Sequence, residues 1–294
     1  MTQPEFRVLG PVEVRRDNAP LSIGDKALAV SACLLISANE FVSVDTLTEW
    51  AWRDKLPAHP RAALHNVLSR LRGLYGPGVI ETRRAGYRLV TDAEHLDLLK
   101  FRQLTAAAVD NLYLQRGCDE KAADLLGEAL ALWRPPPLAN VDSPPLTRDV
   151  VGRLTEQHMN AQEIHAQVCM RLRRYHVIIE QLSAQVDAHP YQESLAGLLM
   201  LAQLRSGRRA DALATYETVR TALRDGLGID PGAPLQQLYL QILQNRIPSP
   251  GQSNGAHPRD RQDVRGPQVR DISLISPLVG MSAELPPVAA SQPS

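Results

Sequence analysis

Residues 60–89 read PRAALHNVLSRLRGLYGPGVIETRRAGYRL, and this stretch decides how the rest of the chain is interpreted. Its first half carries apolar side chains at intervals of three and four residues, namely Leu64, Val67, Leu68 and Leu71. That spacing predicts an amphipathic helix with one buried stripe. The run Gly76-Pro77-Gly78 then predicts the end of the helix, because glycine and proline favour turns.

A hairpin is predicted directly after the helix. Residues 79–82 and 87–90 read as two short strands, and the tip between them is Arg83-Arg84-Ala85-Gly86. A basic helix followed by a basic hairpin is typical of the end of a winged helix-turn-helix domain. In such a domain the helix enters the major groove of DNA, and the hairpin reaches the neighbouring backbone or minor groove.

The predicted DNA-binding residues are the polar side chains of the helix face opposite the stripe and the arginines of the hairpin tip: Arg61, His65, Asn66, Ser69, Arg70, Arg72, Arg83 and Arg84. Arg70 suits guanine and Asn66 suits adenine, because each side chain can form two parallel hydrogen bonds with that base. Arg61 and Arg72 are better placed for phosphates, which position a protein without specifying a sequence.

The remaining members of this set have less definite roles. Ser69 and His65 can reach either a base edge or a phosphate, and Arg83 and Arg84 suit a narrow minor groove or the backbone beside it. The alternative interpretation is a solvated basic face on a surface helix. Charge alone does not separate the two, but the order of a sheet, three helices and a basic hairpin favours DNA binding.

Charge is unevenly distributed along a chain whose formal net charge is zero. Residues 53–90 hold eight Lys or Arg and two acids, a net of +6, whereas residues 91–170 hold seven bases and twelve acids, a net of −5. This asymmetry indicates one segment that meets an anion and another that does not.

The sequence predicts a cytoplasmic protein with no membrane partner. Its three scattered cysteines offer no disulfide framework, the N-terminus lacks the apolar core of a signal peptide, and no apolar run reaches membrane-spanning length. No phosphate-binding loop, nucleophile elbow or metalloprotease motif occurs. His158, His165 and Cys169 have helical spacing but lack further ligands, so we expect no metal, cofactor or catalytic residue.

The residues before 60 predict a small antiparallel sheet followed by two helices. Residues 6–10, 12–14 and 21–23 read as strands, and residues 26–38 read as a strongly apolar helix. Ser43 is a candidate N-cap for the second helix, because serine accepts the free amide hydrogens at helix starts.

The residues after 95 predict an all-α region. Helical spacing of apolar residues occurs in residues 96–115, 120–133, 149–172, 177–188, 192–206 and 210–226. The turns of successive helix pairs align at Gly117, Arg173 and Gly207. Arg173 and Gly207 are 34 residues apart, which is the tetratricopeptide period, whereas Gly117 and Arg173 are 56 residues apart. We therefore expect a short α-solenoid, with Arg173 in the place of the usual glycine.

The longer spacing implies an insertion that contains the sequence WRPPPL at residues 133–138. We interpret this segment as a helix end whose prolines fix the packing of the next helix. A rigid docking loop for a partner is the alternative.

Together these patterns predict an α+β N-terminal winged helix-turn-helix domain followed by an all-α tetratricopeptide-like domain. The predicted boundaries are residues 1–93 and 96–246. Residues 247–294 are predicted to be a disordered tail, because that segment holds eight prolines and no aromatic residue.

Several stretches carry a family resemblance. They are FRVLGPVEV at 6–14, NEFVSVDTLTEWAW at 39–52, VLSRLRGLYG at 67–76, RRAGYRL at 83–89, EALALWRPPPL at 128–138, AHPYQESLAGLLMLAQLRSGRRADALATYETVRTAL at 188–223 and DGLGIDPGAPLQQLYLQIL at 225–243. Together they resemble the Streptomyces antibiotic regulatory protein family, transcriptional activators of actinobacteria with EmbR-like members. The resemblance covers about residues 5–246.

The resemblance implies an OmpR-type winged helix and a tetratricopeptide-like bacterial transcriptional activator domain. It also implies binding to direct repeats in promoter DNA of secondary-metabolite gene clusters, usually by two protomers side by side. Activation would occur through RNA polymerase and its principal sigma factor, without a cofactor or direct ATP control. The segment at 133–138 departs from the usual WRGPPL. The alternative function is a tetratricopeptide-like adaptor that binds protein and does not read DNA.

Overall fold

The computed structural model describes residues 3–52, 56–113 and 118–247. The chain forms two compact units, which meet in the sequence between His165 and Ala166. This division lies within a helix and does not test the domain boundary at residues 93–96, which stays a prediction. The predicted disorder of the tail concerns residues that, apart from 247, lie outside the described ranges.

A three-stranded antiparallel sheet opens the first unit. Its strands, in spatial order, are β1 (Glu5–Arg7), β2 (Glu13–Arg16) and β3 (Ala19–Pro20). The third strand lies before the predicted residues 21–23, because Asp17 and Asn18 form a tight turn with positive φ angles of 50° and 67°. Such a turn reverses the chain within two residues, so pairing with β2 resumes at Ala19.

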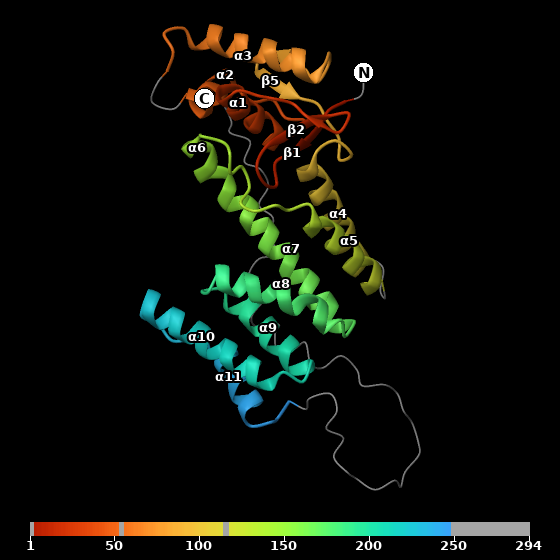
Figure 1. The fold of residues 1–294 in the computed structure, drawn as a ribbon, viewed down its shortest axis with the longest axis vertical. Helices are drawn as coiled ribbons and strands as arrows, with labels where there is room; N and C mark the ends of the chain where they lie inside the picture. Colours follow the sequence, from red (N-terminus) through yellow and green to blue (C-terminus); the bar gives the residue numbers. More distant parts are fainter. Residues whose placement is uncertain (1–2, 53–55, 114–117, 248–294) are drawn as a thin grey trace. The chain divides into compact units, whose positions relative to one another are not determined.

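Three helices follow the sheet: α1 (Asp25–Ile36), α2 (Val44–Trp52) and α3 (Pro60–Tyr75). The Oγ of Ser43 accepts a hydrogen bond of 3.0 Å from the Thr46 amide, which confirms the predicted cap of α2. Figure 1 shows α3 at the edge of this unit, with α1, α2 and the strands all on one side of it.

Helix α3 is anchored along the predicted stripe. Its buried side chains are Leu64, Leu68, Leu71 and Tyr75, and Val67 is half-buried. The Tyr75 hydroxyl lies 2.6 Å from Ser31 Oγ, and its ring meets Phe6 edge to face at 5.1 Å between centroids. Gly76 then ends the helix with a φ of 93°, a conformation that glycine adopts readily.

The hairpin, which we call the wing, consists of β4 (Ile80–Arg83) and β5 (Gly86–Leu89). Ile80 pairs with Leu89 and Arg83 pairs with Gly86, so only Arg84 and Ala85 form the turn. The hairpin was therefore predicted correctly, but its tip is shorter than the predicted four residues. Both Arg83 and Gly86 belong to strands.

The rest of the described chain is helical. Its elements are α4 (Asp97–Tyr113), α5 (Asp119–Ala131), α6 (Pro144–Leu146), the π-helical turn η1 (Thr147–Val151), α7 (Gly152–Arg171), α8 (Tyr175–Ala188), α9 (Glu193–Arg205), α10 (Arg209–Leu227) and α11 (Ala233–Leu243). The six predicted helices are all present, with shifted ends. Helix α11 lay in a stretch noted only for its family resemblance, although Leu235, Leu238 and Ile242 are its buried stripe.

The turns of the predicted repeats share one backbone conformation where they are described. Arg173 has a φ of 57° and Gly207 a φ of 79°, so both take the left-handed form after a helix. Helix α9 packs against both α8 and α10, and nearly all of its side chains are buried. Gly117 lies outside the described residues. The tetratricopeptide assignment itself stays a prediction.

Within the described ranges, no helix is both long and apolar enough to cross a membrane. The same residues contain no group of three or more His, Cys, Asp and Glu side chains that could hold a metal ion. The ring of His158, once considered as a ligand, stacks on Trp133 at 4.2 Å between centroids. Aromatic packing therefore accounts for this histidine.

Gly73 offers a simple test of the backbone of α3. It is exposed, and an added Cβ meets no atom within 4 Å. Gly73→Ala is expected to raise the free energy of unfolding by about 0.8–1 kcal/mol, because glycine loses more backbone entropy in a helix than alanine does. Urea denaturation measures this change. A loss of stability would mean that the α3 backbone is not relaxed at this position.

Candidate nucleic-acid interface

The exposed face of α3 carries most of the residues that the sequence predicted to bind DNA. These are Arg61, His65, Asn66, Ser69 and Arg70, and all five are exposed. At 3.6 residues per turn they share the half of the helix opposite the buried stripe. The structure therefore brings these five side chains together on one surface.

The order of side chains around this face is informative. Arg61 lies on one flank and Arg70 on the other, because nine residues amount to two and a half helical turns. Ala62, Ser69 and Gly73 lie between the flanks, and all three have small side chains. A ridge of small residues between two arginine flanks leaves room for a second surface to approach the helix backbone.

The two wing arginines of the predicted set are both exposed but have different surroundings. Arg84 stands in the two-residue turn. Arg83 lies at the end of β4, with its guanidinium carbon 5.0 Å from the centre of the Phe41 ring. The aromatic face attracts the cation and limits its movement. Arg84 is thus the outermost charge of the wing, and Arg83 is a supported one.

Arg72 differs from the rest of the predicted set, because its guanidinium is hydrogen-bonded to the wing of the same chain. It is half-buried and donates from Nε to the Ile80 carbonyl oxygen at 3.2 Å and from Nη2 to Thr82 Oγ1 at 2.5 Å. Its guanidinium carbon also lies 5.8 Å from the Tyr87 ring centre. Arg72 therefore braces the wing against α3.

Phe41 and Arg88 belong to the surface but were not among the predicted residues. Arg88 lies 4.6 Å from the Phe41 ring centre, and its Nη2 lies 2.6 Å from Glu81 Oε2 on the paired strand. The aromatic ring thus supports two arginines, Arg83 and Arg88. No local pattern reveals this, because Phe41 precedes α2 and is more than forty residues from Arg83 and Arg88 in the sequence.

The base of the wing is tied to the chain before α2. Val42 and Tyr87 exchange backbone hydrogen bonds of 2.8 and 3.0 Å. Gly86 lies directly beside this bridge with a φ of 143°, and a Cβ there would overlap the Val42 carbonyl oxygen. The absence of a side chain at Gly86 therefore allows this close approach.

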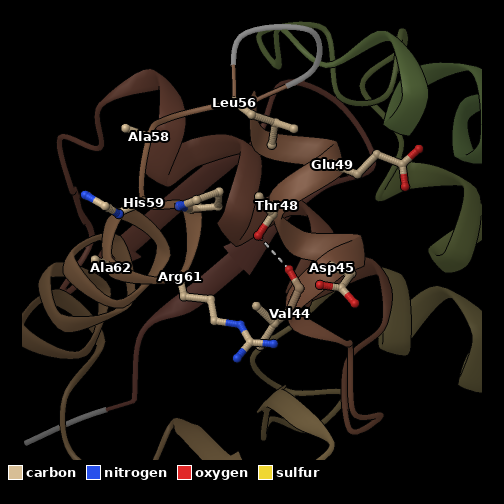
Figure 2. A pocket seen from close by; sticks show the side chains of 10 residues that line it. Val44, Asp45, Thr48, Glu49, Leu56, Ala58, His59, Arg61 and Ala62 are labelled. Atoms are coloured by element: carbon tan, nitrogen blue, oxygen red, sulfur yellow. Dashed lines mark hydrogen bonds between the residues drawn. The ribbon is translucent and has the colours of Figure 1, made fainter.

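An open hollow of about 720 Å³ borders the start of α3. Figure 2 shows Asp45 and Glu49 of α2 on one side of it and Arg61 on the other, with Leu56 at one end. Carboxylates repel phosphates, so the acidic side of the hollow marks where a DNA-binding surface would end. The basic surface thus continues from α3 toward the wing and not onto α2.

Comparisons with known proteins place the chain in a family. The sequence family called the bacterial transcriptional activator domain matches residues 96–243, which are about half of the 294-residue chain. The regulatory protein AfsR of Streptomyces coelicolor is 36% identical over 81% of this chain, which spans only 24% of AfsR. The transcriptional regulatory protein MoaR1 of Mycobacterium tuberculosis is 31% identical over 89% of this chain and 86% of MoaR1.

A solved structure gives the same result for the fold. The structure of Mycobacterium tuberculosis EmbR in complex with a low-affinity phosphopeptide has a TM-score of 0.77 and 30% identity, covering 95% of this chain and 70% of EmbR. The similarity thus extends across both the strands and the helices described above. The chain therefore belongs to the Streptomyces antibiotic regulatory protein family of transcriptional regulators, which includes AfsR, EmbR and DnrI.

Proposed function

We propose that this protein is a sequence-specific DNA-binding transcriptional activator of a secondary-metabolite gene cluster. Residues 1–93 form a winged helix-turn-helix domain, in which α3 enters the major groove and the wing reaches the flanking backbone or minor groove. Residues 96–246 form a tetratricopeptide-like activator domain. The observation that carries this proposal is the exposed polar face of α3 beside two exposed wing arginines.

The proposed roles follow the positions of the side chains. Arg70 and Asn66 lie one helical turn apart on the same flank, so they can read neighbouring bases. Arg61, at the first turn, and Arg83 and Arg84, on the wing, contact phosphates. Ser69 and His65 supply further contacts to bases or phosphates, and Arg72 keeps the wing at a fixed distance from α3.

The activating part of the proposal draws on the family. Two protomers bind side by side on direct repeats near a promoter, and each then presents its activator domain to RNA polymerase and its sigma factor. No cofactor takes part, and the protein acts in the cytoplasm. The relatives named AfsR and DnrI, both from Streptomyces, support a link to regulation in antibiotic-producing bacteria.

Salt dependence tests whether the basic surface contacts phosphates. Three phosphate-binding arginines predict that the logarithm of the affinity falls with the logarithm of the salt concentration at a slope of roughly −3 per protomer, because bound counterions are released. A gel-shift titration on promoter fragments next to the protein's own gene, repeated at several salt concentrations, measures this slope.

Arg148→Ala is a suitable control, because Arg148 is exposed but lies in η1, outside α3 and the wing. This variant is expected to keep the slope of the unmodified protein, whereas Arg84→Ala reduces it by about 1. A DNA affinity that does not change with salt concentration would contradict the proposal and favour the protein-binding adaptor.

A further inference from the structure

The turn between β1 and β2 is bound by a segment more than 120 residues away in the sequence. The Arg134 amide donates to the Leu9 carbonyl oxygen at 2.8 Å, and the Leu138 amide donates to the Gly10 carbonyl oxygen at 2.7 Å. We call residues 134–140 the strap. It follows α5 and includes the prolines of the WRPPPL sequence.

Asn140 extends this pairing with its side chain. Its Oδ1 accepts a hydrogen bond of 2.7 Å from the Val12 amide, and its Nδ2 donates one of 3.0 Å to the Val12 carbonyl oxygen. The carboxamide thus takes the place of a neighbouring strand. Because backbone groups away from water require partners, the turn depends on the strap for bonds that it does not make itself.

A charged contact joins the same two segments to α4. Arg134 Nη1 lies 3.0 Å from Glu13 Oε1, and its Nη2 lies 3.8 Å from Asp97 Oδ2. The Asp97 carboxylate accepts hydrogen bonds of 2.9 to 3.1 Å from the amides of Val8 and Leu9. Burial raises the pKa of Asp97, and these amides and Arg134 oppose that rise.

The shape of the contact is as specific as its polar groups. A Cβ at Gly10 would lie 2.6 Å from the Arg134 carbonyl oxygen, so only glycine lets the strap come this close. Ahead of the strap, Trp133 is 8% exposed and packs edge to face on Phe101 of α4 at 5.3 Å between centroids. Beyond it, Ser143 Oγ donates to the Trp50 carbonyl oxygen of α2 at 2.5 Å.

We propose that the strap is a positioning device that holds α4 and α5 in one orientation relative to α3 and the wing. When α3 binds DNA, the positions of α4 and α5 relative to the promoter are then fixed as well. Arg134 and Asn140 are positioning residues in this scheme, and neither belongs to the proposed DNA-binding set. The consequence for transcription rests on the proposed function, but the orientation itself does not.

Electron-spin distance measurements test the orientation without DNA. Spin labels are attached to cysteines at Glu49 in α2 and Lys121 in α5, both exposed, after Cys118→Ser removes the half-buried native thiol. The strap predicts one narrow distance distribution. Asn140→Ala is expected to broaden it, because two hydrogen bonds disappear. The ratio of protein with the strap bound to protein with the strap released is expected to fall roughly ten- to thirtyfold.

Matched variants make this measurement decisive. Asn160→Ala removes an exposed asparagine from α7 and is expected to leave the distribution narrow. Asn140→Asp keeps the acceptor for the Val12 amide but sets a carboxylate oxygen against the Val12 carbonyl oxygen, so it is also expected to broaden the distribution. Gly10→Ala displaces the strap by steric overlap with Arg134 and leaves the Asn140 side chain intact. Circular dichroism shows which variants remain folded. Identical distributions in folded Asn140→Ala and unmodified protein would overturn the proposal.

Transcription from a promoter fragment that the protein binds supplies the second readout. Folded Asn140→Ala is expected to bind this fragment within about twofold of the unmodified protein and to lose about tenfold in activated transcription, in line with the lost hydrogen bonds. If affinity falls as far as transcription, the strap supports the DNA-binding fold and does not position α4 and α5. If the unmodified protein binds no DNA, the proposed function fails, while the distance measurement still decides the role of the strap.

Discussion

Gly86→Ala is expected to lower the free energy of unfolding by roughly 3–5 kcal/mol, which combines backbone strain with steric overlap. The φ of 143° at Gly86 is rarely adopted by residues with side chains, and a Cβ would overlap the Val42 carbonyl oxygen and lie 2.8 Å from its carbonyl carbon. These are backbone atoms, so no side-chain rotation relieves the overlap. The bridge between Val42 and Tyr87 must open instead. Urea denaturation measures the loss.

Gly78→Ala is the matched control for this experiment. Gly78 has a φ of 85°, yet an added Cβ meets no atom within 4 Å. This variant therefore carries backbone strain alone, and a loss of only about 1–2 kcal/mol is expected. Equal losses in the two variants would contradict the assignment, because they would show that the contact with Val42 contributes nothing.

A folded fraction of Gly86→Ala also separates stability from DNA binding. The wing would be displaced from the chain before α2. Arg83 would then lose the support of the Phe41 ring, which belongs to that chain segment. Affinity for DNA is then expected to fall even at temperatures where the protein remains folded. Gly78→Ala leaves this support in place and is expected to bind normally.

Local patterns in the sequence predicted α3 and the wing well, because both depend on short-range spacing. The stripe through Leu64, Leu68 and Leu71 repeats every three or four residues, and the wing follows a clear turn signal. The same spacing predicted which α3 side chains face outward. Strand ends were less accurate, since the positive φ angles of Asp17 and Asn18 moved a strand start by two residues.

Contacts between distant residues were beyond the reach of those patterns. The role of Gly86 depends on Val42, and the brace formed by Arg72 depends on the wing having folded against α3. The sequence classed Arg72 with the phosphate-binding arginines because its charge and helical position match theirs. Only the structure shows the hydrogen bonds that tie its guanidinium to the wing.

The strap shows the same limit on a larger scale. The sequence indicated that the prolines at 133–138 fix the packing of the next helix, and it carried no sign that this segment pairs with the turn between β1 and β2. Asn140 and Val12 are 128 residues apart, and a single asparagine in a loop carries no signal of a partner. The predicted boundary at residues 93–96 placed the two segments in different domains, yet hydrogen bonds join them within one compact unit.

Arg70→Ala is expected to weaken binding to a specific promoter site by roughly 1–3 kcal/mol and to change binding to unrelated DNA little. The reason is the position of Arg70 on the exposed flank of α3, one turn from Asn66, where its guanidinium can bind a guanine edge with two hydrogen bonds. Gel-shift titrations on specific and unrelated fragments of equal length, at one salt concentration, measure the ratio of the two affinities.

Two further variants distinguish base reading from simple charge. Arg70→Lys keeps the charge but loses the planar fork, so it is expected to restore binding to unrelated DNA without restoring the affinity ratio. Arg84→Ala removes a charge from the wing tip, so it is expected to weaken both fragments equally and to leave the ratio unchanged. If Arg70→Ala also weakens both fragments equally, Arg70 contacts phosphate, and the reading of bases must be assigned to Asn66, Ser69 or His65 instead.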